Sequence, residues 1–462
     1  MTLKTMIGAA ELIRQLEAKE ISAVEYAKET LLFKEDNDHL NAVSHFDSNL
    51  LLQNAEKADE ARAKGQNGPL CGVPVALKDN INTTAFPTTA GTAALLNNTP
   101  KQNAGVVTAL LEAGAYVGGK AGMHELAFGI TSNNSVTGAV RNPHDPSKIP
   151  GGSSGGSASS VAAGIFPVAL GTDTGASVRL PAALCGIVGF RPTIGRYSNE
   201  GVVPVSSTRD TVGPLARHVE DITLVDSALS GRTRITKKKS LRDVILGVPK
   251  EVLFDNLDPA VEVAVQSALK EFERAGVKLV EVSLADVFKH NEAIGFPVAL
   301  YEVMQELPEY LAQYAPGVSF EELIAKIGSP DVAGILKSQL GSDAIPEAVY
   351  RAAIDTHRPA MKALYADLFK QHGLSALVLP TTPTTACNVG DDETFTLNGE
   401  QVPTFPTFIR NTDFGSNIGV PGISIPCPIT AGLPVGIEFE GLAEGDDDLL
   451  SLALSVEELF SK

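Results

Sequence analysis

Two serine-rich segments carry the residues of this chain that are best suited to chemistry. The first, PGGSSGGSASSVAAG, places Ser153 and Ser154 between pairs of glycines, and the second, GTDTGASVRLPAA, contains Ser177. A serine hydroxyl is a poor nucleophile at neutral pH until a base activates it. The sequence therefore offers Ser153 and Ser177 as nucleophiles and requires a base from another part of the chain.

A candidate base lies upstream, at the end of the apolar run in GVPVALKDN. This residue, Lys78, acts as a base only when it is neutral, and burial or a nearby positive charge can lower its pKa. A lysine at the end of a strand is more often a solvated surface charge. From the residues alone, both interpretations of Lys78 stay open.

The segment around Ser177 follows the apolar run FPVAL, so residues 171–177 are predicted to form a loop at the end of a strand. Such loops often carry functional residues. Successive backbone N–H groups of Thr174, Gly175, Ala176 and Ser177 could point at one position, which is the geometry that an oxyanion hole requires. The alternative is a structural loop with a satisfied serine.

The first segment also matches other patterns. Gly151, Ser153 and Gly155 fit the G-x-S-x-G nucleophile elbow, but an elbow follows a strand, and the preceding RNPHDPSKIP is predicted to be a loop. A P-loop would need a Lys-Ser/Thr pair that is missing. A flexible linker would not run directly into the apolar stretch 161–170. The segment is therefore predicted to form a tight turn whose amides and hydroxyls point into a cleft.

Size and charge exclude several classes of partner. With 462 residues, 44% of them hydrophobic, the chain is long enough for one large α/β domain or two smaller ones. A formal charge of -18 at pH 7 would repel a phosphate backbone, so no nucleic-acid partner is expected. The basic cluster 232–242 is predicted to be a solvated linker. No apolar run approaches the length of a membrane span, so we expect no membrane partner and a cytoplasmic protein.

The cysteines and histidines predict no metal or cofactor site. His124 and Glu125 could begin an H-E-x-x-H motif, but residue 128 is a phenylalanine. The cysteines are scattered and form no C-x-x-C pair, which argues against a zinc site and a disulfide scaffold. Thiols in apolar surroundings are typical of core residues, and these are Cys71, Cys185, Cys387 and Cys427.

The elements that must position the serines and the lysine alternate between helical and β-type periodicity. Residues 1–65 are predicted to form a helical N-terminal layer of three helices, with Ser22 as an N-cap. In the motif-bearing region 69–215, short β-runs such as 73–77 flank helical stretches such as 105–114. This alternation predicts an α/β fold, in which helices cover the faces of a sheet.

The second half of the chain continues this pattern. A β-run at 244–248, an amphipathic helix at 259–275 and a β-run at 277–282 predict a βαβ crossover. Residues 286–371 are mostly helical in period and could cap a substrate pocket, with plain helical packing as the alternative. The C-terminal part returns to β-runs before a final helix. Without a repeat or a clear linker, residues 1–462 are predicted to form a single domain.

Three motifs in this order resemble the amidase signature family. They are K-D-N at Lys78, G-G-S-S-G-G-S from Gly151 and G-T-D-T-G-x-S-x-R-x-P-A from Gly171, and the resemblance extends weakly through LPTTPT and GLPVGIEF. The separations of 75 residues from Lys78 to Ser153 and 24 from Ser153 to Ser177 match the Ser-cisSer-Lys triad of that family. The resemblance implies a mixed sheet sandwiched between helical layers.

The resemblance also implies roles for these residues. Ser177 is the nucleophile, Ser153 relays the proton after a cis peptide bond from Gly152, and Lys78 is the base. No cofactor is implied. The alkoxide attacks the amide carbon, and N–H groups near Ser177 hold the oxyanion.

Further residues are expected to support this triad. Ser154 is expected to hydrogen-bond Ser153, and Asp173 and Arg179 to fix the loop, because a charged pair can satisfy backbone groups. One position departs from the family pattern, since the family usually has glycine in place of Ala176. If that position needs a positive φ, alanine costs about 1 kcal/mol and shifts the oxyanion donors.

Two stretches, 123–146 and 397–422, resemble the indoleacetamide and mandelamide hydrolases of this family. This resemblance implies an amidohydrolase that cleaves a small arylalkyl primary amide to a carboxylic acid and ammonia. An apolar pocket for the aromatic ring is then expected. Its candidate residues, for each of which core packing is the alternative, are Phe128, Ile130, Phe405 and Phe408.

Other functions remain open. A glutaminase (A) subunit of a tRNA-dependent amidotransferase would carry the same triad, although the HELAF stretch at 124–128 and the acidity argue against it. The chain could also hydrolyse other small amides or anilides. A non-catalytic binding or scaffold relative is a third class, against which the intact triad argues. The expected partner is a small-molecule amide, and a homodimer is open because relatives in the family are often dimers.

Overall fold

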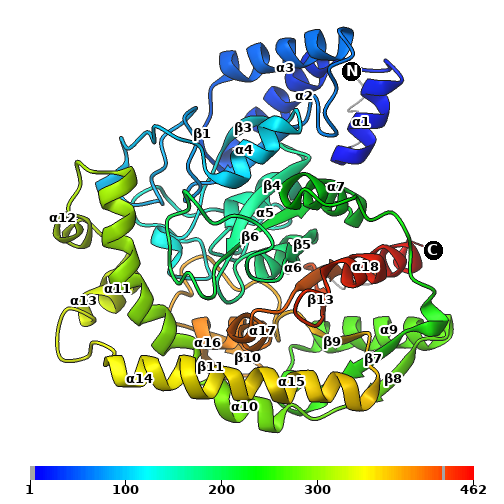
Figure 1. The fold of residues 1–462 in the computed structure, drawn as a ribbon, viewed down its shortest axis with the longest axis vertical. Helices are drawn as coiled ribbons and strands as arrows, with labels where there is room; N and C mark the ends of the chain where they lie inside the picture. Colours follow the sequence, from blue (N-terminus) through cyan, green and yellow to red (C-terminus); the bar gives the residue numbers. More distant parts are fainter. Residues whose placement is uncertain (1–5, 429–431, 462) are drawn as a thin grey trace.

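An eleven-stranded mixed sheet forms the centre of the molecule (Figure 1). The computed structural model describes residues 6–428 and 432–461, so residues 1–5 of the predicted N-terminal layer lie outside the described residues. Helices pack on both faces of the sheet, which confirms the predicted α/β fold. In spatial order the strands are β1 (Val43–His45), β3 (Tyr116–Ala121), β2 (Pro74–Lys78), β4 (Val168–Asp173), β6 (Thr211–Ala216), β5 (Val188–Arg191), β12 (Gly422–Pro426), β13 (Gly436–Glu440), β9 (Ala376–Pro380), β7 (Ile245–Val248) and β8 (Lys278–Glu281).

Parallel strand pairs occur in two blocks of this sheet. β2 pairs in parallel with β3 and β4, and β7 pairs in parallel with β8 and β9, whereas the other pairs are antiparallel. Parallel neighbours need crossover connections, which contain α4 (Gly105–Glu112), α5 (Gly155–Ala162) and α9 (Pro259–Ala275). The unit β7–α9–β8 confirms the predicted βαβ crossover.

The N-terminal layer contains the three predicted helices, α1 (Ala9–Glu17), α2 (Ala23–Asp36) and α3 (Ser48–Ala63). Ser22 caps α2 as predicted. Its hydroxyl accepts a hydrogen bond from the Glu25 backbone N–H, and the Glu25 carboxylate accepts one from the Ser22 N–H. This reciprocal arrangement satisfies two backbone donors at the start of the helix.

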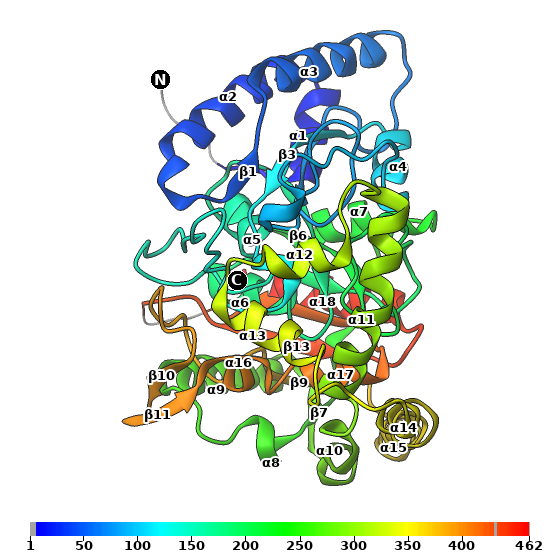
Figure 2. The ribbon, with the colours of Figure 1, turned by 90° about the vertical axis from the view of Figure 1, so that its left-hand side faces the viewer.

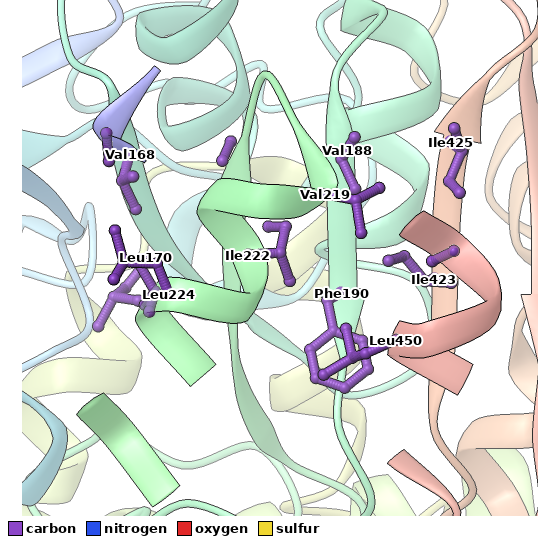
Figure 3. Packing of buried hydrophobic residues seen from close by; sticks show 14 of the residues in the cluster. Val168, Leu170, Val188, Phe190, Val219, Ile222, Leu224, Ile423, Ile425 and Leu450 are labelled. Atoms are coloured by element: carbon purple, nitrogen blue, oxygen red, sulfur yellow. The ribbon is translucent and has the colours of Figure 1, made fainter. Parts of the chain in front are cut away.

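The two faces of the sheet bury different side chains because residues alternate along each strand. In β4, Val168 and Leu170 belong to the large core that includes α7 (Val219–Ser230) and α18 (Asp446–Phe460), whereas Ala169 belongs to a smaller core with α5. The small residues on the α5 side let that helix lie close to the strands that carry the serine-rich motifs. Figure 3 shows the large core, with Val168, Leu170, Val188, Phe190, Val219, Ile222, Leu224, Ile423, Ile425 and Leu450 labelled.

The region 286–371 is helical and forms two further cores beside the sheet. In Figure 2 its yellow-green segments α11 to α13 face the viewer, in front of the sheet. A π-helical turn (Ala353–His357) joins its last two helices. The helices are α10 (Ala285–Asn291), α11 (Gly295–Tyr314), α12 (Phe320–Ala325), α13 (Pro330–Ser338), α14 (Glu347–Ala352) and α15 (Arg358–His372).

Shorter elements complete the fold. Short 3-10 turns (Asp38–Leu40, Ala93–Leu95, Glu125–Ala127 and Leu241–Asp243) join some of the main elements. The four cysteines are buried and free, as the sequence predicts for core thiols. Within the described residues, no helix has the length and apolar character needed to cross a membrane. The remaining helices and strands are α6 (Arg179–Cys185), α8 (Lys250–Leu253), the hairpin β10 (Thr394–Leu397) and β11 (Glu400–Pro403), α16 (Thr404–Ile409) and α17 (Asp413–Ile418).

Candidate active site

Lys78 is the last residue of β2 and is completely buried between β3 and β4. Its Nζ lies 2.8 Å from Ser153 Oγ and 2.7 Å from Thr172 Oγ1, with the Thr172 carbonyl oxygen at 3.4 Å. The interpretation of Lys78 as a solvated surface charge is therefore wrong. The structure brings the lysine and the first serine-rich turn together across 75 residues of sequence.

Burial changes the acid–base chemistry of this lysine. Removal from water disfavours the ammonium form and lowers the pKa of Lys78 from 10.5 to about 7, although the Asp173 and Asp210 carboxylates raise it in part. At neutral pH, a large fraction of the Lys78 side chains is therefore unprotonated. The nitrogen can accept a proton from the hydroxyl that it contacts.

Ser153 and Ser154 occupy the turn that precedes α5. The Gly152–Ser153 peptide bond is cis, and the Ser153 carbonyl oxygen accepts a hydrogen bond of 3.1 Å from the His124 N–H. Ser154 Oγ bonds both backbone groups of Thr172, at 3.2 Å each. Ser154 thus holds β4 against the turn beside Lys78, and it does not bond the Ser153 hydroxyl directly.

The loop that carries Ser177 begins later than predicted. β4 continues to Asp173 because Thr172 and Asp173 still pair with β6, so the loop is residues 174–178 rather than 171–177. The end of β4 is set by its pairing with β6, which continues past Gly171 to Asp173. α6 then begins at Arg179.

Backbone donors in this loop divide into two groups. The N–H groups of Val178 and Arg179 donate to the Asp173 carboxylate. Within the described residues, those of Gly175, Ala176 and Ser177 donate to no protein acceptor. The loop therefore offers consecutive unpaired amides beside the Ser177 side chain.

Ala176 adopts a backbone conformation that suits an alanine. It is not among the described non-glycine residues with positive φ, and it is buried in an apolar cluster. The cost expected for a left-handed alanine therefore does not arise, and the loop keeps its form without a glycine there.

A network of buried charged side chains holds the loop 174–178 in place. Arg179 contacts the Asp173 carboxylate at 3.1 Å, the Gly175 carbonyl oxygen at 3.1 Å, and two glutamates of β13, Glu438 at 2.7 Å and Glu440 at 3.0 Å. These side chains are all fully buried.

Charges within this network set the proton states. Burial alone would raise the pKa of Asp173, but the guanidinium groups of Arg179 and Arg191 hold it well below its usual range. Burial and the neighbouring Glu438 carboxylate raise the pKa of Glu440 well above its usual value. Asp173 and Arg179 thus stand as a charged pair under the loop, in the structural position expected from the sequence.

A cavity opens beside the loop and is also lined by residues of α11, α13, α16 and α17. Ser177 lines this cavity and is 8% exposed, and within the described residues its hydroxyl has no hydrogen-bond partner in the protein. Lys78 and Ser153 are not among the lining residues. Of these three residues, Ser177 alone therefore lines the cavity.

Three of the four predicted pocket residues line this cavity, namely Phe128, Ile130 and Phe405. Phe408 does not. It is fully buried and packs against Phe395, with ring centroids 5.2 Å apart. Phe405 and Ile409 of α16 are four residues apart, lie on the same side of the helix and line the cavity. Phe408 is turned about 100° from its neighbour Ile409 and packs with the β10 residues Phe395 and Leu397.

The sequence interpretation missed several residues of the site. Thr172, which contacts Lys78, lies inside the second motif and could have been found from its position at the end of the strand. Phe296 lines the cavity, is 48% exposed and packs against Phe405 at 5.6 Å. Arg209 and Asp413 form an ion pair in the cavity wall, but they are 204 residues apart in sequence, and no motif links them.

Comparisons with known proteins extend over nearly the whole chain. The sequence model of the Amidase family matches residues 30–450. An indoleacetamide hydrolase of Rhizobium radiobacter is 42% identical over 450 residues, which cover 97% of this chain and 96% of that protein. A mandelamide hydrolase of Pseudomonas putida is 41% identical over 477 residues, which cover 99% and 92%. A crystal structure of an amidase has a TM-score of 0.86 and 33% identity, and the match covers 98% of this chain and 99% of that one.

Proposed function

The chain belongs to the amidase family, and from that premise we propose that it hydrolyses a small arylalkyl primary amide to a carboxylic acid and ammonia. Relatives that are 41–42% identical over almost the entire chain are an indoleacetamide hydrolase and a mandelamide hydrolase. Both names describe amides whose acyl group carries an aromatic ring. The apolar cavity beside Ser177, with the rings of Phe128, Phe296 and Phe405 in its wall, has the character that such a group requires.

The acylation step uses the two serines and the lysine in sequence. Neutral Lys78 accepts the proton of Ser153, and Ser153 accepts the proton of Ser177 as the Ser177 oxygen attacks the amide carbon. A C–O bond forms, and the carbonyl electron pair moves onto the oxygen. The unpaired N–H groups of Gly175, Ala176 and Ser177 are the donors for this oxyanion.

The remaining steps return the protons. Ser153 protonates the amide nitrogen and regains a proton from Lys78, and the C–N bond breaks to release ammonia. Water then attacks the acyl-enzyme and gives its proton to the same relay, which releases the carboxylic acid and restores the Ser177 hydroxyl. No proton is gained or lost by the enzyme over the cycle.

One observation carries this proposal. The Nζ of Lys78 is completely buried and lies 2.8 Å from Ser153 Oγ, with its pKa lowered to about 7. A buried lysine with a pKa of about 7 is largely neutral at neutral pH, so it is poorly suited to serve as a surface charge or as an ion-pair partner. It is suited to accept a proton from a hydroxyl at neutral pH.

The experiment is an ammonia-release screen with the purified protein. Its substrates are indole-3-acetamide, mandelamide, phenylacetamide, short aliphatic amides and glutamine, with Ser177→Ala as the inactive control. We expect the arylalkyl amides to be the best substrates. Ammonia release from glutamine alone would replace this proposal with the glutaminase alternative, and release mainly from aliphatic amides would remove the arylalkyl specificity.

A covalent probe tests the assignment of the nucleophile independently of the substrate. A fluorophosphonate should label the protein, and peptide mapping should place the adduct on Ser177. Labelling of Ser153 in place of Ser177 would contradict the proposed division of roles.

A further inference from the structure

Among the described residues that line the mostly apolar cavity there is one ion pair. Arg209 and Asp413 both line the cavity, and Arg209 Nη2 donates to Asp413 Oδ1. Arg209 Nη1 donates to the Gly295 carbonyl oxygen at 2.7 Å, so the guanidinium is held from two sides. The ion pair is not needed for the proton relay, because it contacts neither Lys78 nor Ser153.

The Asp413 carboxylate has unused capacity to accept hydrogen bonds. Oδ1 receives one from Arg209, and Oδ2 receives one of 2.9 Å from Asn417 Nδ2. An ionised carboxylate has about four lone-pair positions. The Asp413 side chain is 14% exposed, and its accessible part belongs to the cavity wall.

Two glycines lie close to this carboxylate and leave room around it. A Cβ atom on Gly175 would lie 3.0 Å from Asp413 Oδ1, and a Cβ atom on Gly295 would lie 2.9 Å from Oδ2. Both glycines line the cavity and come from different parts of the chain. A side chain at either position would crowd one of the two carboxylate oxygens.

The position of the relay shows which part of the substrate this carboxylate faces. In the proposed mechanism the amide nitrogen must lie toward Ser153 and Lys78, which do not line the cavity. The acyl portion then occupies the cavity that Ser177 lines. Since Gly175 is in the oxyanion loop, Asp413 lies close to the carbonyl end of that acyl portion.

We propose that Asp413 selects amides whose acyl portion carries an N–H or O–H hydrogen-bond donor, an inference that rests on the proposed function. A ring N–H, as in an indole, and an α-hydroxyl, as in a mandelic group, are the two donor types that fit an arylalkyl amide. A binding site whose acceptor pairs with a hydrogen-bond donor of the substrate discriminates against an analogue without that donor. When such an analogue binds, the buried acceptor loses its hydrogen bonds to water and gains none from the ligand. Asp413 is thus a specificity-determining residue.

The test compares kcat/KM within two pairs of substrates that differ in the donor. Indole-3-acetamide is compared with 1-naphthaleneacetamide, and mandelamide with phenylacetamide. We expect the wild-type enzyme to prefer the donor-bearing amide at least about tenfold in one pair, which equals about 1.4 kcal/mol. The pair that shows the preference identifies the donor as the ring N–H or the α-hydroxyl.

Asp413→Asn should bring that ratio close to one. The side-chain amide of the introduced asparagine has a single acceptor oxygen, for which Arg209 and the substrate would compete. Ile409→Val, another change in the cavity wall, is the matched control, since it alters the fit of both members of a pair and should keep their ratio. If Asp413→Asn does not fold, Gly295→Ala tests the same contact, because its Cβ would crowd Oδ2 and lower the ratio.

The outcomes separate this proposal from the one on which it rests. Equal kcat/KM values within both pairs would overturn the role of Asp413 and leave the hydrolysis of arylalkyl amides intact. A preference that survives both Asp413→Asn and Gly295→Ala would also overturn it. If none of the four amides is hydrolysed, the proposed function itself fails, and the role of Asp413 fails with it.

Discussion

Replacement of Lys78 by methionine should abolish activity and yet stabilise the fold. Methionine is similar in length and apolar, so it can fill the same buried space without a charge. Wild-type Lys78 has a pKa of about 7 in the folded protein and 10.5 in the absence of burial. Because the folded state binds this proton more weakly than the unfolded chain, folding is penalised at every pH below 10.5.

The size of the penalty follows from the two pKa values. Each pH unit between them corresponds to about 1.4 kcal/mol. The penalty is therefore about 2 kcal/mol at pH 9, about 4 kcal/mol at pH 7, and constant well below the folded pKa. The variant also loses hydrogen bonds to Ser153 and Thr172, worth about 1 kcal/mol each at any pH. At pH 7 the variant should thus be more stable by about 2 kcal/mol, and at pH 9 the two proteins should be nearly equal.

Scanning calorimetry at pH 7 and pH 9 measures this difference as a change in Tm. The entropy of unfolding is about 2.1 cal/mol/K per residue, so about 1 kcal/mol corresponds to about 1 °C for a chain of 462 residues. The Tm advantage of Lys78→Met should therefore shrink by about 2 °C between pH 7 and pH 9. Lys101→Met, at an exposed position, is the control for the general effect of removing a lysine.

Two results would refute this reasoning. A Tm difference that is the same at both pH values would mean that Lys78 does not have the lowered pKa. A variant that keeps near-normal amide hydrolysis would remove the lysine from the mechanism, since loss of a general base usually costs about 10²–10⁴ in rate.

Three other predictions test the remaining parts of the site. In wild-type protein, kcat/KM should rise about tenfold per pH unit below pH 7 and level off above it, because only neutral Lys78 accepts a proton; a flat profile over this range would contradict the assignment. Ala176→Gly should change kcat/KM by less than about threefold and lower stability by about 0.5–1 kcal/mol, since no positive φ requires a glycine there; a large gain in activity would show that alanine distorts the loop. Arg179→Met should leave the buried Glu438 carboxylate without its charged partner and the Asp173 carboxylate with Arg191 alone, and cost about 3–5 kcal/mol, visible as a lower Tm and reduced yield of folded protein; an unchanged Tm would mean that the network contributes little.

The amphipathic helices could be predicted largely from periodicity because each buries one face. The central strands are buried on both faces and were predicted as short β-type runs. The helix 259–275 was predicted with the bounds that α9 has, and Ser22 caps α2 as expected from its position. The end of β4 was placed too early because strand length depends on pairing with β6, a partner about 40 residues away. Local glycine content carries no information about that pairing.

Within the site, too, sequence patterns could not predict which side chains line the cavity. Phe405 and Phe408 are both aromatic and lie three residues apart, which places them on neighbouring parts of one helix face. The packing of α16 between the cavity and the β10–β11 hairpin decides that Phe405 lines the cavity and that Phe408 packs against Phe395. Phe296, on α11, belongs to the region 286–371, for which a cap over a substrate pocket and plain helical packing both stayed open. Its place in the cavity wall depends on how that region docks against the rest of the molecule.

The sequence by itself determined the family resemblance and the α/β class, and it led to the proposal of Lys78, Ser153 and Ser177 as site residues, because short motifs and periodic patterns are local properties. Only the tertiary structure decided that Lys78 is buried against Ser153, and that Arg209 and Asp413 meet in the wall of the cavity. The physical reason is that burial and ion pairing depend on which segments pack together. A lowered pKa and an open carboxylate arise from that packing, and neither is encoded at a single position of the chain.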